Sequence, residues 1–171
     1  MKKGGGKAKG AGFERLICKR LSQWLSGGLR EDLFWRSAMS GGRATVMHKS
    51  GKKNKTQGGD ITATDPIGHK LIDIFSVECK CVRNLALDSA MVKGKGEFIT
   101  FWEQTCYDAL RANKVPLLIA HQNQMPTIVA TMDVRGVDFK ATPLGVIYRR
   151  RSAAILIYDF EALMASPCPL L

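Results

Sequence analysis

The stretch GGDITATDPIGHKLIDIFSVECK, residues 58–80, joins short apolar segments to charged residues. Residues 71–80 are rich in β-forming types, and alternate side chains of a β-strand point to the same face. The residues predicted to share one face are Ile72, Ile74, Ser76, Glu78 and Lys80. Because Pro66-Ile67-Gly68 is typical of a turn, we expect residues 60–63 and 71–80 to be adjacent strands of a hairpin.

Three charged residues fall close together in that predicted hairpin. Asp60 begins its first strand, and Glu78 and Lys80 stand two apart on the second. An ionised group that leaves water must be paired or bound to a metal. Two carboxylates can gather a hard cation such as Mg²⁺, which bridges to phosphate oxygens, and a nearby lysine can orient or deprotonate an attacking water. The alternative is an exposed cross-strand charge pair, with Asp60 as an ordinary turn residue.

These three residues resemble the D…E-x-K signature of the PD-(D/E)XK nuclease superfamily, with Gly59 in place of the family's usual proline. In that family the proline shapes the turn and does not touch the metal, so we expect the exchange to cost little. Two further segments are similar to the archaeal-type Holliday junction resolvases and their phage relatives. They are Gly12-Phe13-Glu14-Arg15 and Arg36-Ser37-Ala38-Met39-Ser40-Gly41.

The resemblance implies a set of catalytic residues in one order along the chain. They are Glu14, Arg36, Ser40, Asp60, Glu78, Lys80 and Gln104. Asp60, Glu78 and Glu14 would hold Mg²⁺, for which Mn²⁺ would substitute, and Arg36 and Ser40 would serve the scissile phosphate. Without the resemblance, Glu14 is a surface glutamate that favours a helix N-terminus, Arg36 is a strand-end charge and Ser40 forms a turn.

The charge balance favours a polyanionic partner. An excess of 26 Lys and Arg over 15 Asp and Glu gives a formal net charge of +11. We expect residues 1–11 to form a disordered basic arm and residues 41–58 a mobile basic loop, because both combine glycine and lysine with few apolar residues. The loop is equally compatible with a solvated insertion. The basic residues predicted to bind DNA are Lys2, Lys3, Lys7, Lys9, Arg43, Lys49, Lys52, Lys53 and Lys55.

Composition also bounds the class of protein. A chain of 171 residues that is 45% hydrophobic can bury one core, and we predict a single domain over residues 12–171. No run of 18 apolar residues offers a membrane span, and the N-terminus lacks the apolar segment of a secretory signal. Five cysteines without C-x-x-C spacing indicate a reducing compartment. We therefore expect a cytoplasmic protein of a bacterial or phage-infected cell.

The order of elements predicts the fold class. Apolar residues at helical spacing predict helices over 12–26 and 98–112, the first ending at Gly27-Gly28. Strands are expected over 33–36, 115–120, 127–132 and 153–158, and Asp159 is placed to cap a short last helix. This order is typical of an α/β fold, and the resemblance implies a restriction-endonuclease-like mixed β-sheet flanked by helices.

These observations predict a metal-dependent endodeoxyribonuclease that cuts branched DNA such as four-way junctions. Two equivalent cuts in a symmetric junction imply a homodimer. One rival is a nuclease of the same chemistry that acts on other DNA, in restriction, repair or packaging. The other is a noncatalytic DNA-binding protein, which would gain nothing from two clustered carboxylates.

Overall fold

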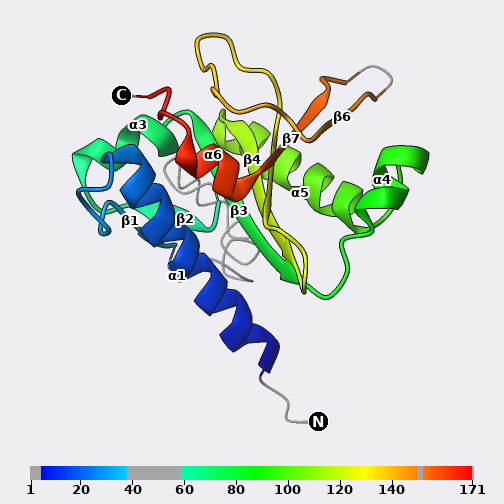
Figure 1. Ribbon diagram of the computed structural model, residues 1–171, viewed down its shortest axis with the longest axis horizontal. Coiled ribbons are helices and arrows are strands. Elements are labelled where there is room, and N and C mark those ends of the chain that lie inside the picture. Colours follow the sequence, from blue (N-terminus) through cyan, green and yellow to red (C-terminus); the bar gives the residue numbers. More distant parts are fainter. Residues whose placement is uncertain (1–4, 38–58, 150–151, 171) are drawn as a thin grey trace.

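The computed structural model describes residues 5–37, 59–149 and 152–170, with the backbone alone for residues 5–7. Figure 1 shows the elements, which in chain order are α1 (Gly5–Leu25), β1 (Phe34–Arg36), β2 (Ile61–Ala63), η1 (Pro66–Gly68), α3 (His69–Ile72), β3 (Phe75–Val82), α4 (Leu87–Lys93), α5 (Glu97–Ala112), β4 (Val115–Gln122), β5 (Ile128–Thr131), β6 (Gly145–Ile147), β7 (Ile155–Asp159) and α6 (Phe160–Ala165). Among the residues described, no helix has the length and apolar character needed to span a membrane.

Five strands form the central sheet in the order β3-β4-β5-β7-β6. β3 and β4 are parallel, because the chain between them crosses over through α4 and α5. The other neighbouring pairs are antiparallel, and a short connection over residues 123–127 joins β4 to β5. β3 therefore lies at an edge of the sheet, and one side of its backbone is left for other partners.

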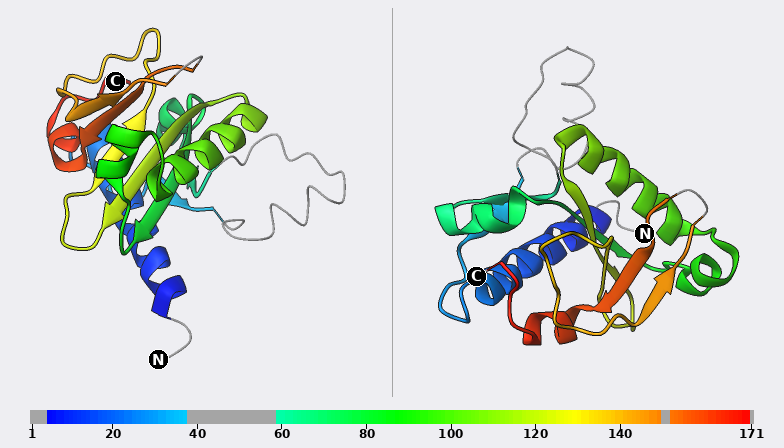
Figure 2. Two further views of the ribbon diagram at one scale, coloured as in Figure 1. Left: turned by 90° about the vertical axis from the view of Figure 1, so that its right-hand side faces the viewer. Right: turned by 90° about the horizontal axis from the view of Figure 1, so that it is seen from above.

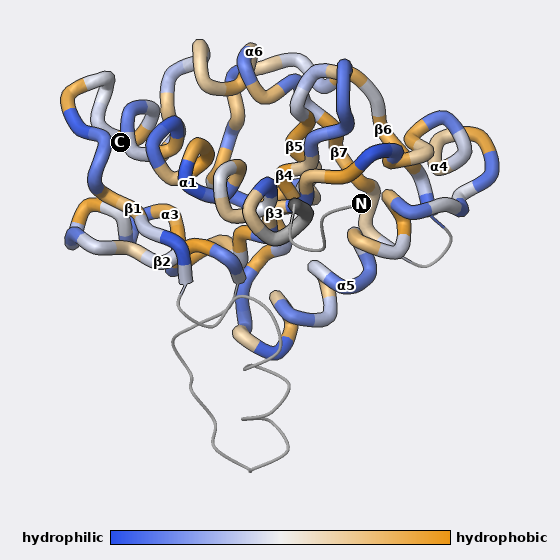
Figure 3. Tube along the Cα trace, turned by 90° about the horizontal axis from the view of Figure 1, so that it is seen from below, coloured by the Kyte–Doolittle hydropathy of each residue, from blue (hydrophilic) through white to orange (hydrophobic). Residues whose placement is uncertain are grey.

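Helices cover both faces of this sheet (Figure 2). On one face, α1 and α6 pack against alternate strand residues such as Val77, Leu117 and Ile119. On the other face, α4 and α5 pack against the intervening residues Leu118 and Ala120. Figure 3 shows hydrophobic residues along the central strands and a mixture of hydrophobic and hydrophilic residues around α1 and α5. The predicted α/β fold with a mixed sheet flanked by helices is confirmed.

β1 and β2 form a separate antiparallel ribbon, in which Arg36 pairs with Ile61. The predicted hairpin between residues 60–63 and 71–80 is therefore wrong. Asp65 begins a helical turn by accepting a hydrogen bond from the backbone N–H of Ile67 at 2.9 Å, and the chain stays helical through α3. Leu71 and Ile72 are buried as residues of the helix α3, and the strand begins only at Phe75.

α1 begins at Gly5, seven residues before the expected start. The expectation that residues 1–11 are disordered is thus wrong for residues 5–11, while residues 1–4 lie outside the described part. The apolar stripe of α1, which includes the buried Ile17, Leu21 and Leu25, anchors the helix on the core. Once this part of the helix has formed, extending it toward the N-terminus requires only propagation, which costs far less free energy than nucleating a new helix.

The remaining elements follow the expected order closely. α5, β4 and β5 lie within a few residues of their predicted places. Asp159 caps α6 as predicted, because its carboxylate accepts a hydrogen bond from the Ala162 N–H at 2.8 Å. α1 ends at Leu25, shortly before Gly27 and Gly28, which both have positive φ, and the Gly28 N–H donates to the Gln23 carbonyl at 2.7 Å. α4 and β6 were not predicted.

Candidate active site

Glu78 and Lys80 lie on the face of β3 that α5 covers. Their side chains form an ion pair with a distance of 2.7 Å from Lys80 Nζ to Glu78 Oε1. Lys80 Nζ also lies 5.4 Å from the centroid of the Phe101 ring on α5, within the range of a cation–π interaction. Glu78 is only 9% exposed, so the alternative of a solvent-exposed charge pair does not hold.

Asp60 lies at the open edge of β3, just before β2. Its backbone N–H donates to the Val77 carbonyl at 2.7 Å, and its carboxylate Oδ2 accepts from the Cys79 N–H at 2.9 Å. Its carbonyl accepts from the Ser37 N–H at 2.7 Å, which links it to the end of β1. Backbone contacts on both sides therefore fix this carboxylate beside the Glu78–Lys80 pair.

Gly59 permits this docking on the edge of β3. It forms an isolated parallel bridge with Val77 and has a φ of +97°, a conformation that L side chains rarely adopt. A Cβ atom here would lie 2.4 Å from the Val77 carbonyl oxygen. Proline, whose φ is fixed near −65°, cannot take this conformation. Glycine is thus required by the backbone here, and its exchange for the usual proline is more than a neutral change of turn residue.

Glu14 of α1 and Arg36 of β1 form an ion pair between Glu14 Oε2 and Arg36 Nε. The Glu14 side chain is 13% exposed, so it is not the surface glutamate of the alternative interpretation. Burial raises the pKa of the Cys18 thiol to about 12, with the Glu14 charge adding to the rise and the Arg36 charge opposing it. The Glu14–Arg36 ion pair therefore lies at the border of the hydrophobic core, next to the Cys18 thiol.

The three carboxylates are close enough to influence one another. Burial raises the pKa of Asp60 to about 7, and the charge of Glu78 and then that of Glu14 add to the rise. The Cys79 N–H and the charge of Lys80 act in the opposite direction. Burial and two neighbouring negative charges thus disfavour the ionised form of Asp60, and a bound cation would favour it.

The carboxylate oxygens of this site suit a hard divalent cation, because Mg²⁺ prefers oxygen ligands. In proteins it is usually bound by one or two carboxylates and keeps several water ligands. Among the described residues, no three Asp, Glu, His or Cys side chains are already arranged as a metal cage. The ion pairs account for this, because Glu14 is turned to Arg36 and Glu78 to Lys80. These residues fit a metal if Glu14 and Glu78 exchange their present partners, in part, for the cation.

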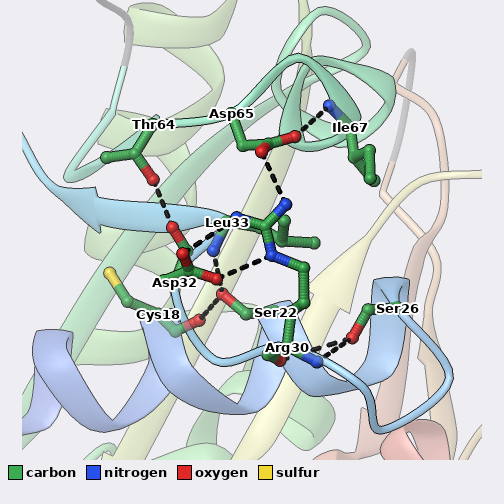
Figure 4. Close-up of polar contacts among 9 residues, drawn as sticks. All are labelled: Cys18, Ser22, Ser26, Arg30, Asp32, Leu33, Thr64, Asp65 and Ile67. Carbon is green, nitrogen blue, oxygen red and sulfur yellow. Dashed lines mark hydrogen bonds and ion pairs between the residues drawn. The ribbon is translucent and has the colours of Figure 1, made fainter.

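A network of polar contacts holds the β1–β2 ribbon against α1 (Figure 4). The Leu33 N–H donates to Ser22 Oγ on α1 at 3.1 Å. The Arg30 guanidinium bridges Asp32, at 2.8 Å, and Asp65, at 2.6 Å. These contacts tie the entry of β1 to the exit of β2, so that Glu14, on α1, keeps its place relative to the ribbon.

Gln104 is exposed on α5 and makes no hydrogen bond within the described part of the chain. It shares a helical face with Phe101, three residues before it, and Asp108, four residues after it. Burial alone would lower the pKa of Lys80, but the charges of Glu78, Asp60 and Asp108 raise it overall. Phe101 and Asp108 were missed as neighbours of Lys80, although their spacing from Gln104 on the predicted helix was the available signal.

Most of the predicted DNA-binding residues, and Ser40, lie outside the described residues. They are Lys2, Lys3, Arg43, Lys49, Lys52, Lys53 and Lys55. The structure describes the backbone of Lys7 but not its side chain. Lys9 is described, and its ammonium donates to Oδ1 of Asn123 at the end of β4. The structure thus brings together Glu14, Arg36 and the Asp60–Glu78–Lys80 trio, with Gln104 on the adjacent helix.

Comparison with known proteins agrees with this geometry. A family model described as "Phage putative PDDEXK endonuclease" matches residues 5–162. No match to a curated protein or to a solved structure was found. The matched range includes every described residue of the site and both faces of the sheet. The chain therefore belongs to this family of phage PDDEXK endonucleases, a branch of the PD-(D/E)XK nucleases.

Proposed function

We propose that the protein is a Mg²⁺-dependent endonuclease that resolves four-way DNA junctions by paired phosphodiester hydrolysis. The observation that carries this proposal is the convergence of Asp60, Glu78 and Glu14, with Lys80 beside them, at the open edge of β3. Carboxylates placed in this way repel one another, and a divalent cation relieves that repulsion. Phosphate binding alone would be weakened by such a cluster.

In the proposed site, Asp60 and Glu78 hold the cation and Glu14 completes the ligand set. Mn²⁺ substitutes for Mg²⁺, since carboxylate and water ligands suit both ions. When bound, the cation supplies a more acidic water and stabilises the charge that develops on the phosphoryl oxygens. Lys80, positioned by Glu78 and the Phe101 ring, donates ammonium hydrogens to the attacking water or to a phosphate oxygen.

Arg36 and Ser40 are proposed to bind the scissile phosphate. Arg36 is paired with Glu14 in the structure, so a cation on Glu14 would release the guanidinium for a charge-assisted hydrogen bond to phosphate. Gln104 is proposed to support the site from α5, where it lies one helical turn from both Phe101 and Asp108.

The choice of a branched substrate rests on the resemblance of the segments around Glu14 and Arg36 to junction resolvases. A net charge of +11 supports DNA as the partner, with the predicted basic residues as phosphate contacts. A four-way junction needs two equivalent cuts, which a homodimer with one site per subunit would make. The protein would then act in the cytoplasm of the bacterial or phage-infected cell, where such junctions arise.

A cleavage panel tests the proposal. Four-way junction, flap, linear duplex and single-stranded DNA of matched sequence are incubated with Mg²⁺ and the wild-type protein, with Asp60→Asn as the control. We expect cutting of opposing strands in the junction, none with Asp60→Asn, and little on the separated arms. Equal cutting of all four DNAs would overturn the junction assignment in favour of another PD-(D/E)XK activity. Equal cutting by the wild type and a folded Asp60→Asn variant would overturn the site itself.

A further inference from the structure

An open cleft of about 600 Å³ lies at the carboxyl ends of β3 and β4. Its lining residues are Arg83, His121, Gln122, Asn123 and Gln124. Figures 1 and 2 show that the N-terminal half of α1 projects on this same side of the sheet. Lys9 on that half of α1 bonds to Asn123, and the Phe13 ring packs on the His121 ring with 5.9 Å between centroids.

Hydrogen-bond donors dominate this cleft. Gln122 uses its amide oxygen to accept from the Leu85 N–H at 2.7 Å, and Asn123 uses its amide oxygen to accept from Lys9. Both side-chain amides are thereby left with their NH₂ groups as donors. Arg83 is exposed and adds a guanidinium, while the described residues that line the cleft include no Asp or Glu. A surface of this kind suits an anion with several oxygens and repels a metal cation.

The strand β3 and the helix α1 both extend from the candidate active site toward the cleft. Arg83 follows Lys80 by three residues, which is about 10 Å along β3. Lys9 precedes Glu14 by five residues, which is about 8 Å along α1. Successive phosphates of one DNA strand rise by about 3.4 Å along the helix axis and also wind around it, so they lie further apart than this rise, and the cleft lies roughly one or two nucleotides from the carboxylates.

We infer that this cleft binds the sugar-phosphate backbone of the cleaved strand, roughly one or two nucleotides from the scissile phosphate. Arg83 and the Asn123 amide are the contacts to phosphate oxygens, and Lys9 holds the Asn123 side chain in the donating orientation. The inference rests on the proposed function and adds a subsite to it. It makes the cleft a positioning surface that holds the strand in register with the metal ligands.

Binding measurements test the subsite without requiring cleavage. The protein carries Glu78→Gln in every sample, and its affinity for a fluorescent four-way junction is measured in EDTA over a range of salt concentrations. Arg83→Ala removes the guanidinium, and Asn123→Ala removes the amide. The matched control is Arg135→Ala, because Arg135 is an exposed arginine in a second cleft, with Asp133 and Asp138, beyond the opposite end of β5.

We expect Arg83→Ala to weaken binding roughly tenfold and to reduce the logarithmic salt slope by about 0.9, the effect of one lost phosphate contact. Arg83→Lys should restore the slope, and Asn123→Ala should weaken binding with little change in slope. Unchanged thermal midpoints confirm that each variant is folded. Equal effects of Arg83→Ala and Arg135→Ala, or none from Arg83→Ala, would overturn the subsite.

A second readout maps the position. A single methylphosphonate, which lacks the phosphate charge, is placed one to five nucleotides from the cleavage site in separate substrates. With active protein, the substitution roughly one or two nucleotides away should slow cleavage by the wild type but not further slow Arg83→Ala. Equal sensitivity of both proteins would contradict the inference. Loss of cleavage on every DNA would instead count against the proposed function, while the binding result would still decide the subsite.

Discussion

Asp60 is held as a half-buried carboxylate beside Glu78 and Glu14, and its pKa of about 7 is well above the ordinary value near 4. A folded state with the higher pKa binds more protons than the unfolded state, so stability is greatest below pH 4 for this group and falls as the pH rises toward 7. Metal-free protein should therefore lose stability over that range, because the unfolded chain ionises this residue while the folded protein keeps it largely protonated.

Asp60→Asn tests this electrostatic cost. The amide oxygen of asparagine can still accept the Cys79 N–H, but the charge is gone. In EDTA we expect the variant to unfold at a higher temperature than the wild type at pH 7.5, with the difference shrinking toward pH 5. Thermal unfolding monitored at several pH values measures it. A variant that is less stable than the wild type at pH 7.5 would contradict the proposed repulsion.

Gly59 controls how Asp60 reaches β3. Gly59→Ala forces a Cβ atom to within 2.4 Å of the Val77 oxygen and adds the strain of a positive φ, roughly 1–3 kcal/mol by itself. The matched control is Gly136→Ala, where φ is +86° and no atom of the described residues lies within 4 Å of the added Cβ. We expect both variants to be destabilised, and only Gly59→Ala to lose the thermal stabilisation that Mg²⁺ gives. Equal Mg²⁺ responses in the two variants would show that the contact with β3 does not place Asp60.

At the level of elements, Arg30 holds the ends of the β1–β2 ribbon together. Its guanidinium lowers the pKa of Asp32, and the Ile67 N–H followed by Arg30 lowers the pKa of Asp65. Because both carboxyl groups have lower pKa values in the folded state, their stabilising effect is present above about pH 4 and is lost as the pH falls through the folded-state values.

Arg30→Lys keeps the charge but cannot bridge two carboxylates with a planar fork. We expect a lower thermal midpoint than the wild type at pH 7 and a smaller difference near pH 3. Amide hydrogen exchange should also become faster in β1 and β2 than in α5, since the contact is local. Arg111→Lys is the control, because its guanidinium contacts the exposed Tyr107 ring instead of a carboxylate. A pH-independent loss of stability in Arg30→Lys would argue against the ion-pair explanation.

The elements also show which parts of the fold could be predicted from the sequence. α1 and α5 follow helical periodicity, because one face of each helix is buried, whereas β4 and β5 are continuous apolar runs, because both of their faces are buried. The hairpin was mispredicted because the mostly apolar segment 71–75 fits either a strand or a partly buried helix, and only the Asp65 cap on the preceding turn favours the helix. β6, with three residues, is too short for its pattern to be distinctive.

The sequence points to the residues of the candidate site, but it does not show how the fold brings them together. Asp60, Glu78 and Lys80 stand out by type and spacing, and the structure brings them together. The route by which Asp60 reaches β3, a parallel bridge at the sheet edge, depends on tertiary contacts that no local pattern contains. The same holds for Phe101 and Asp108, which become neighbours of Lys80 only because α5 packs on the sheet.

For the whole molecule, the net charge of +11 predicts strongly salt-dependent DNA binding. Because α1 begins at Gly5, deleting the first ten residues would shorten a helix as well as remove charge. Replacing Lys2, Lys3, Lys7 and Lys9 by glutamine removes the charges and keeps the length of α1, although Lys9→Gln also removes the contact with Asn123. We expect weaker binding to all DNAs and a salt slope reduced by about 0.9 for each lost contact, measured by fluorescence anisotropy. An unchanged slope would assign these lysines to solubility.

The measurement that tests the central claim most directly is the Mg²⁺-dependent rate of junction cleavage by Glu78→Gln. The matched control is Glu31→Gln, the same change at an exposed glutamate that pairs with Lys19. If Glu78 is a ligand of the catalytic cation, its replacement should slow cleavage by roughly a hundredfold or more, with DNA affinity retained and Glu31→Gln unaffected. Cleavage at the wild-type rate by folded Glu78→Gln protein would contradict the account.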